Sequence, residues 1–348
     1  MEIMSAKMML NCLKSSLFAA LLLFFQVTTA QPDFSGIETI IKQNQKAITN
    51  DVTVIVNKDG KNIYVRENPE FRLKNPAPVY QSSRWFTAAV VMVFVDEGKI
   101  SLDDPVSKYL PIFDKYFKGY ITIRQCLGHT TGIQAEASGV MKLAQKNRFA
   151  TLEEEVNAFV SKREIQDNAG TAFFYSNIGP NIAGRVLEVV AKKSFDRVAQ
   201  EKLFRPLGMR NTSFYAEKGS IDPSEGATSS AFDFMNFLVM LLNNGQFNGK
   251  KILSEESVSF LKTQQFPDVP IKYLPKELSA YTAVPGAWVE EKSADGTPAI
   301  ISSPSFAGVI PWVDFNKKYA AIIFPKNELS EEKRKPIQQL RKEIEEAL

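Results

Sequence analysis

The sequence predicts an α/β (α+β) fold in which one antiparallel sheet, formed from both termini of the chain, packs against a helical lobe. Strand-forming runs stand near the beginning of the chain, helical periodicity fills the middle, and strand-forming runs return near the end. The first and last strands are therefore expected to pair. A cleft between the sheet and the helical lobe is then the natural ligand site.

The amino-terminal segment is expected to lie outside this fold. Lys7 and Lys14 are followed by an uncharged apolar run from Leu17 to Phe25 and by the small residues 28–30. This order is typical of a secretory signal peptide, and the run is too short to span a bilayer comfortably. Cys12 precedes the apolar run rather than following it, so a lipid anchor is not expected.

We therefore expect a signal peptide over residues 1–30, cleavage near Ala30, and a single domain over residues 31–348. The mature protein would be periplasmic or secreted, without a stable membrane anchor. Cys126 is its only cysteine, so no disulfide can form within the chain. A chain of this length can bury a full hydrophobic core without one.

The composition argues against several kinds of partner. The 42 basic and 39 acidic residues are scattered, with a net charge of +3 and no basic block, so nucleic acid is not expected. His129 is the only histidine, and with one mature cysteine it cannot assemble a His/Cys zinc site. We predict no metal and no cofactor, and a small-molecule or peptide ligand in the cleft.

A β-hairpin opens the domain. Residues 51–56 and 61–65 are rich in strand-forming residues. Asp59-Gly60 between them suits a two-residue turn, because both central positions of that turn need positive φ.

Helices are predicted to follow. Residues 85–97 form a long apolar stretch just before Gly98, which indicates a buried helix. Apolar residues at three-to-four spacing predict helices over 152–162, 178–192, 195–204 and 231–242. Strands over 299–302, 309–314 and 319–324 and an amphipathic helix over 330–348 close the chain. The Pro-rich segment 266–292 has no assignable pattern.

An ordered series of short motifs runs along the chain. They are Trp85-Phe-Thr-Ala88, Val95-Asp-Glu-Gly98, Leu102-Asp-Asp-Pro-Val-Ser-Lys-Tyr-Leu-Pro111, Ile121-Thr-Ile-Arg-Gln-Cys-Leu-Gly-His-Thr-Thr-Gly132, Tyr175-Ser-Asn177 and Pro206-Leu-Gly-Met209. By these motifs the chain resembles the β-lactamase-related serine hydrolase family, which includes class C β-lactamases, D-alanyl-D-alanine carboxypeptidases and many esterases. The resemblance covers nearly all of the mature chain and implies the β-lactamase/transpeptidase-like fold of penicillin-binding proteins.

The chemistry of such a site needs three groups of residues. A serine and a lysine three residues apart share one helix face, so the amine can activate the hydroxyl. A Tyr-x-Asn or Ser-x-Asn motif moves protons and holds the acyl side chain. A Lys-Thr-Gly motif or a relative of it, on a strand at the cleft, orients the substrate.

The resemblance places the nucleophile at Gln81 and its base at Arg84, directly before the Trp-Phe-Thr motif. A glutamine amide has no hydroxyl or thiol to ionise, and arginine stays protonated at any physiological pH. Both changes predict impaired catalysis. Ser82 and Ser83 stand beside this position, and a shift of register would make one of them the nucleophile.

The Tyr-x-Asn motif is matched in full, whereas the Lys-Thr-Gly motif is matched only weakly. Tyr175 and Asn177 match the second motif, although packing of the ring and an N-cap role for the amide are the structural alternatives. Ser303-Pro-Ser305 stands where Lys-Thr-Gly is expected and carries no cation, while Gly308 would keep the close strand approach. By the resemblance, Tyr175 and Asn177 join Gln81 and Arg84 as active-site positions, and Ser303, Ser305 and Gly308 are the predicted substrate-binding positions.

Three functions are compatible with the sequence. The chain is an impaired homologue in which Arg84 binds a peptide or cell-wall carboxylate, or an active serine esterase or peptidase that uses Ser82 or Ser83 with Tyr175 as base. The third is a scaffold or docking protein whose cleft is closed by Gln81 and Arg84. His129 is expected to hold a structural turn, and Cys126 to be a buried, inert thiol.

Overall fold

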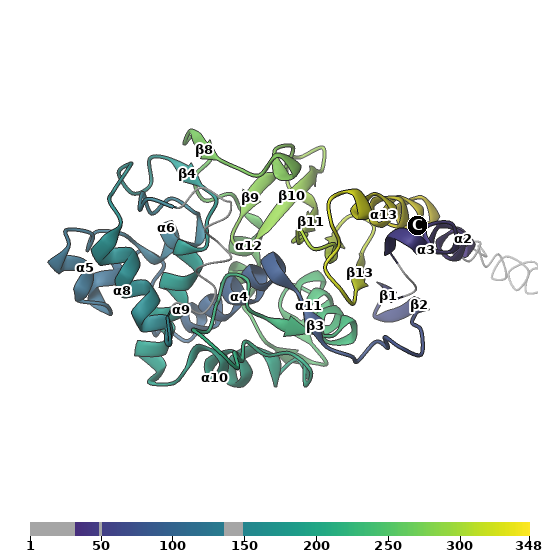
Figure 1. The fold of residues 1–348 in the computed structure, drawn as a ribbon, viewed down its shortest axis with the longest axis horizontal. Coiled ribbons are helices and arrows are strands. Elements are labelled where there is room, and N and C mark those ends of the chain that lie inside the picture. The colour runs from purple at the N-terminus through teal and green to yellow at the C-terminus, as the bar shows by residue number, and fades with distance from the viewer. Residues whose placement is uncertain (1–31, 49–50, 136–148) are drawn as a thin grey trace, which may run out of the picture.

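The computed structural model describes residues 32–48, 51–135 and 149–348 (Figure 1). At its centre is a seven-stranded antiparallel sheet in the order β2-β1-β13-β12-β11-β10-β9. Its strands are β1 (Val52–Lys58), β2 (Lys61–Arg66), β9 (Thr282–Val284), β10 (Ala287–Lys292), β11 (Pro298–Ser302), β12 (Ile310–Asp314) and β13 (Tyr319–Pro325). Two-residue or three-residue strands outside this sheet are β3 (Ala77–Pro78), β4 (Phe173–Phe174), β5 (Thr228–Ser229), β6 (Gln246–Phe247), β7 (Lys250–Lys251) and β8 (Ile271–Tyr273).

Helices make up the lobe on the left of Figure 1 and also cover both faces of the sheet. The longer ones are α2 (Ser35–Gln43), α4 (Ser83–Asp96), α8 (Leu152–Lys162), α9 (Ile178–Ala191), α11 (Ala231–Leu242), α12 (Glu255–Lys262) and α13 (Lys335–Ala347). The shorter ones are α3 (Gln45–Ile48), α5 (Ile112–Lys115), α6 (Ile123–Leu127) and α10 (Phe195–Ala199). Within the described residues, none is both long and apolar enough to cross a membrane.

The first and the last strands of the described chain lie side by side in the sheet. Strand β1 pairs with β2 on one side and with β13 on the other, from Val52 opposite Pro325 to Lys58 opposite Tyr319. This confirms the predicted pairing of the first and last segments. Asp59 and Gly60 have φ of 52° and 74°, the positive values that the two-residue hairpin turn requires.

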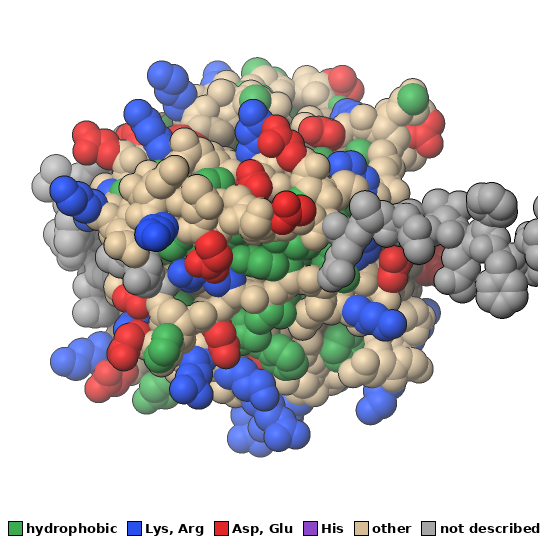
Figure 2. All heavy atoms as spheres, turned by 90° about the vertical axis from the view of Figure 1, so that its right-hand side faces the viewer, with side chains coloured by type: hydrophobic (Ala, Val, Ile, Leu, Met, Phe, Trp, Pro, Cys, Tyr) green, Lys and Arg blue, Asp and Glu red, His purple; other side chains and the backbone are tan. Residues whose placement is uncertain are grey.

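Side chains alternate along β1, so each face of this strand packs into a different hydrophobic cluster. Val54 and Val56 point into a cluster with residues of α2 and α13, whereas Ile55 points into the larger cluster with α4 and α11. The sheet is therefore buried on both faces. Figure 2 looks at the side of the molecule that α2 and α13 occupy, where basic and acidic side chains are interspersed.

Helix α4 is the central element of the helical lobe. Every residue from Ser83 to Phe94 is buried, which explains why its sequence is apolar all round rather than striped. The chain leaves the helix through Gly98, which has φ of 65°. The predicted buried helix is confirmed, and it begins two residues before Trp85.

Most of the other predicted elements are also confirmed, α8 and α11 with the predicted bounds. Segment 195–204 is divided into α10 and a π-helical turn over Gln200–Phe204. The expectation that strand character returns only near the end, from residue 299, was wrong, because β9 and β10 both lie within the segment 266–292, which showed no pattern. These strands are short, and the β10 register shifts against β11, so the period-two signal is broken.

Gly286, in the turn between β9 and β10, lies against the beginning of α4. A Cβ at this position would meet the Arg84 carbonyl oxygen at 2.4 Å, and φ is 75°. Gly296 has a φ of 84°, but a Cβ there would meet nothing within 4 Å.

We expect Gly286→Ala to lower the free energy of unfolding by about 1–3 kcal/mol more than Gly296→Ala, because only the former adds a steric clash to the backbone strain. Urea denaturation of both variants measures this difference. Equal losses would contradict the close approach of this turn to α4.

Candidate functional site

Residues 81–84 lie where the chain enters α4. A short 3₁₀ turn over Tyr80–Ser82, labelled η2, precedes the helix, and the backbone of Tyr80 is left-handed with φ of 49°. Such a conformation is costly for a residue with a side chain, so the surrounding structure must hold this turn in place.

Gln81 is held by the loop that joins β11 to β12. Its side chain is 8% exposed, and its Oε1 accepts a hydrogen bond of 3.0 Å from the backbone N–H of Phe306. A backbone N–H that faces a nucleophile position can stabilise a developing oxyanion. Here the neutral amide oxygen of Gln81 occupies that donor.

Arg84 is buried and paired. Its Nη2 lies 3.0 Å from Glu225 Oε1, its Nη1 donates a hydrogen bond to the Tyr175 hydroxyl, and its guanidinium lies 4.2 Å from the centre of the Tyr175 ring. The side chain is 4% exposed. Its Nε is buried without a hydrogen-bond partner among the described residues.

Tyr175 packs into an aromatic group rather than facing open solvent. Its ring lies 4.9 Å from that of His129 and 5.3 Å from that of Trp288. Burial raises the pKa of the Tyr175 hydroxyl above its usual value, and the nearby charge of Arg84 offsets part of this effect. The hydroxyl is therefore poorly suited to act as a base at neutral pH.

Asn177, the other residue of the second motif, is the N-cap residue of α9. Its side chain makes no capping hydrogen bond to that helix. The structure thus joins Tyr175 to Arg84 and joins Gln81 to Phe306, while Asn177 stands at the beginning of the adjacent helix.

Ser82 and Ser83 are fully buried, and both hydroxyls are used inside the protein. Ser82 Oγ donates to the Ser303 carbonyl at 2.5 Å, and Ser83 Oγ accepts from the backbone N–H of Ala227 at 3.0 Å. Both bonds link the beginning of α4 to segments far away in the sequence.

The third motif forms a turn after β11 rather than a continuation of that strand. Ser303 Oγ donates to the Gly286 carbonyl at 2.9 Å, and Ser305 Oγ accepts from the backbone N–H of Val309 at 3.0 Å. Gly308 has φ of 104°, and a Cβ there would lie 2.9 Å from Leu329. This explains the need for glycine at position 308.

A cavity of about 260 Å³ adjoins this turn. Ser305, Phe306 and Gly308 line one side of it, and residues of α13 and of the preceding turn line the other. Three basic residues, Arg334, Lys335 and Arg341, and three acidic ones, Glu277, Glu290 and Glu331, line it. Arg341 is neutralised by Glu290, with contacts of 2.8 and 2.5 Å.

His129 is a buried residue with a structural role. It is 6% exposed, has φ of 56°, and its Nδ1 accepts a hydrogen bond of 3.4 Å from the backbone N–H of Ser176. Burial and the charge of Arg84 lower its pKa to about 3, so the imidazole is neutral at physiological pH. The buried Cys126 thiol has a pKa raised by burial, which fits an inert side chain.

Acidic residues form a part of the site that sequence reasoning missed. Glu225 pairs with Arg84. Burial, and next the charge of Glu225, raise the pKa of Asp222. Glu155 accepts a hydrogen bond of 2.8 Å from the Ser220 hydroxyl. Burial and the neighbouring Asp222 raise the pKa of Glu155 to about 7. No motif marked these residues, because they come together only through folding.

Comparison with known proteins places this geometry in context. A family model described as beta-lactamase matches residues 38–335. Protein flp of Staphylococcus aureus (strain COL) is 27% identical over 190 residues, which are 51% of this chain and 38% of that protein. Beta-lactamase-like protein 4 of Dictyostelium discoideum is 25% identical over 320 residues, which are 75% of this chain and 55% of that protein. The chain thus spans less than two thirds of the length of these curated relatives.

Solved structures share the fold at low sequence identity. A candidate beta-lactamase from Bacteroides dorei DSM 17855 has a TM-score of 0.79 at 24% identity, covering 90% of this chain and 98% of that one. A penicillin binding protein from Bacillus halodurans has a TM-score of 0.70 at 17% identity, covering 90% and 100%. EstCE1, a hydrolase with promiscuous acyltransferase activity, has a TM-score of 0.68 at 18% identity, covering 88% and 98%.

The raised pKa of Glu155 makes stability depend on pH. A carboxyl whose pKa rises from 4.5 to about 7 on folding binds its proton more tightly in the folded state, so stability falls as pH rises through this window. We expect a loss on the order of 2 kcal/mol between pH 4.5 and 8. Thermal denaturation across this range should show a smaller fall for Glu155→Gln than for the unmodified protein. Glu154→Gln, on the exposed side of α8, should retain the full fall.

Proposed function

Because the chain belongs to the beta-lactamase family, we propose that it is an exported member that keeps the fold of these hydrolases but does not form an acyl intermediate. Its proposed role is to bind a ligand that carries a carboxylate, such as a peptide or a cell-wall fragment. Export is proposed from the charged and apolar pattern of residues 1–30.

One observation carries the proposed loss of acylation. Both side chains at the family's nucleophile and base positions are engaged by the chain itself, Gln81 by the Phe306 N–H and Arg84 by Glu225 and Tyr175. Neither the amide nor the permanently charged guanidinium can attack a carbonyl or accept a proton from a nucleophile. A change of side-chain conformation at Gln81 and Arg84 would not restore catalysis, because other residue types would be needed at both positions.

The neighbouring serines do not offer an obvious replacement. A nucleophile must reach the substrate and have a base within hydrogen-bond distance. The Ser82 hydroxyl is turned to the Ser303 carbonyl and that of Ser83 to Ala227, and neither side chain is exposed. The raised pKa of Tyr175 also argues against its service as their base.

The ligand carboxylate is better placed beside the third motif than at Arg84. Glu225 already neutralises Arg84, so a second carboxylate there would meet little uncompensated positive charge. In the adjoining cavity, Lys335 is exposed, and Arg334 forms a longer ion pair of 3.6 Å with Glu277. An anionic group of a bound peptide would therefore contact Lys335 and compete with Glu277 for Arg334.

A second function is favoured by the same ion pair. If the Arg84–Glu225 pair serves only to stabilise a filled cleft, the protein acts as a scaffold for a protein partner and needs no small ligand. The 4% exposure of Arg84 supports this alternative. Binding measurements separate the two, because only the first function requires affinity for a small carboxylate.

We expect no covalent adduct when the protein is incubated with a fluorescent penicillin or with a fluorophosphonate. Intact-mass spectrometry measures this directly, and a catalytically active family member serves as the positive control. An added acyl or phosphonyl mass that disappears in Ser82→Ala or Ser83→Ala would overturn the proposal in favour of an active serine hydrolase.

The binding role is tested by calorimetric titration with an acetylated peptide that ends in D-Ala-D-Ala. We expect measurable affinity that falls about tenfold when Arg334 and Lys335 are both changed to Ala, because the carboxylate loses its charge-assisted hydrogen bonds. Lys333→Ala is the matched control, since Lys333 is exposed in the same turn but does not line the cavity. Failure to bind the peptide would favour the scaffold function.

A further inference from the structure

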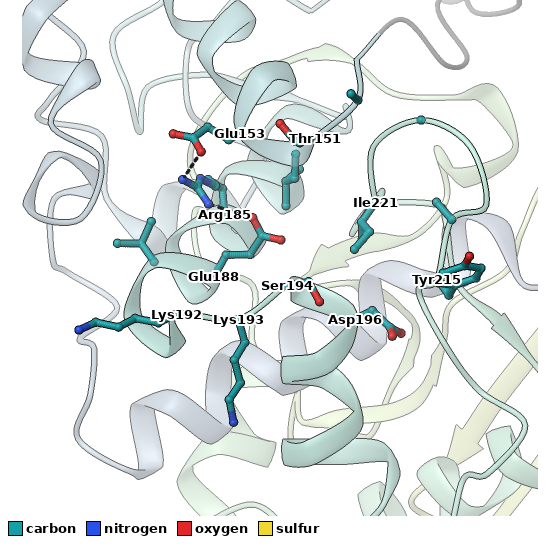
Figure 3. Close-up of a pocket in the computed structure, with 15 residues that line it drawn as sticks. Thr151, Glu153, Arg185, Glu188, Lys192, Lys193, Ser194, Asp196, Tyr215 and Ile221 are labelled. Carbon is teal, nitrogen blue, oxygen red and sulfur yellow. Dashed lines mark hydrogen bonds and ion pairs between the residues drawn. The ribbon is translucent and has the colours of Figure 1, made fainter.

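A second hollow, of about 770 Å³, lies in the helical lobe away from the site described above (Figure 3). Its lining comes from the beginning of α8, the carboxyl-terminal half of α9, the beginning of α10 and the loop around residues 215–221. It shares no lining residue with the cavity beside Ser305. The volume is large enough for a ligand of several rings.

The polar groups of this hollow are held in fixed positions by the protein. Arg185 contacts Glu153 at 2.8 Å and Glu188 at 3.1 Å, and Glu188 also accepts the backbone N–H of Phe195 at 2.8 Å. On the adjacent helix, Asp196 accepts the N–H of Phe214 at 2.7 Å. A carboxylate can accept about four hydrogen bonds, so each keeps capacity for further donors. Such pre-organisation lowers the entropic cost of binding.

The charges of the lining balance. Three basic side chains, from Arg185, Lys192 and Lys193, stand with three acidic ones, from Glu153, Glu188 and Asp196. This arrangement offers many donors and acceptors but no net attraction for an anion or a cation. A neutral ligand with many hydroxyl groups matches it best.

An exposed aromatic ring adds an apolar surface to the hollow. Tyr215 is 70% exposed, and Figure 3 shows it with Ile221 on the side opposite Arg185 and Glu188. A large exposed ring beside fixed polar groups provides an amphipathic contact surface at low entropic cost. The named lining elements are helices and a loop, so they present no strand edge to which an extended peptide could add.

From these features we infer that the hollow between α8, α9 and the loop that carries Tyr215 is a binding site for a neutral saccharide. The apolar face of a sugar ring lies against Tyr215, and its hydroxyls donate to the carboxylates and accept from Arg185, whereas Lys193 is paired with Glu201 at 2.5 Å. The inference does not depend on the proposed carboxylate site, since the two sites have no residue in common.

Titration calorimetry with tetra-N-acetylchitotetraose and cellotetraose as neutral probes tests this site. We expect at least one probe to bind, with an affinity that does not change between low and high salt, because the ligand carries no charge. Tyr215→Ala should weaken binding about tenfold, equal to about 1.4 kcal/mol. Tyr120→Ala, which removes another exposed tyrosine outside the hollow, should leave the affinity unchanged.

Three results would overturn the inference. These are the absence of binding by both probes at millimolar concentration, an affinity that is insensitive to Tyr215→Ala, and a strong loss of affinity in salt. Because Tyr215 is exposed, its replacement should not unfold the protein, and an unchanged melting temperature verifies this. Unchanged affinity of Tyr215→Ala for the D-Ala-D-Ala peptide would show that the two sites act separately.

Discussion

The pairing of β1 with β13 is the constraint on which the other parts of the molecule depend. It joins strands that are about 270 residues apart, for example through the hydrogen bond from Thr53 to the Phe324 carbonyl, with a separation of 271 residues. Closing so long a loop has an entropic cost, which the burial of both sheet faces must offset. The sheet places the turn after β11 against the beginning of α4, where Ser82 contacts Ser303 and Gln81 contacts Phe306.

The burial of Arg84 explains much of the local structure at this point. Lysine can lose its proton when it is buried, but arginine keeps its charge, so a buried guanidinium needs a carboxylate and an aromatic or polar surround. Glu225 and Tyr175 supply them. Burial and the nearby Glu225 raise the pKa of Asp222, and burial and Asp222 in turn raise the pKa of Glu155. A position at which the family has a base is thus built here as a neutralised, immobile ion pair, in keeping with the non-acylating role proposed above.

Prediction from sequence succeeded where the signal is local and periodic. The Asp59-Gly60 turn depends on the conformational freedom of two adjacent residues, and α11 depends on apolar spacing within twelve residues. It failed for β9 and β10, because one is three residues long and the other has an irregular register. Such strands are stabilised by the neighbours they pair with, and a single sequence window does not contain those neighbours.

For the candidate site, the sequence by itself determined which side chains stand at positions 81, 84 and 175, and therefore which of them can ionise, because ionisation chemistry belongs to the residue type. Only the tertiary structure decided what those side chains touch. Glu225 lies 141 residues after Arg84, and Phe306 lies 225 residues after Gln81. No local pattern links residues so far apart, since folding brings two separate loops, which carry Glu225 and Phe306, to the beginning of α4.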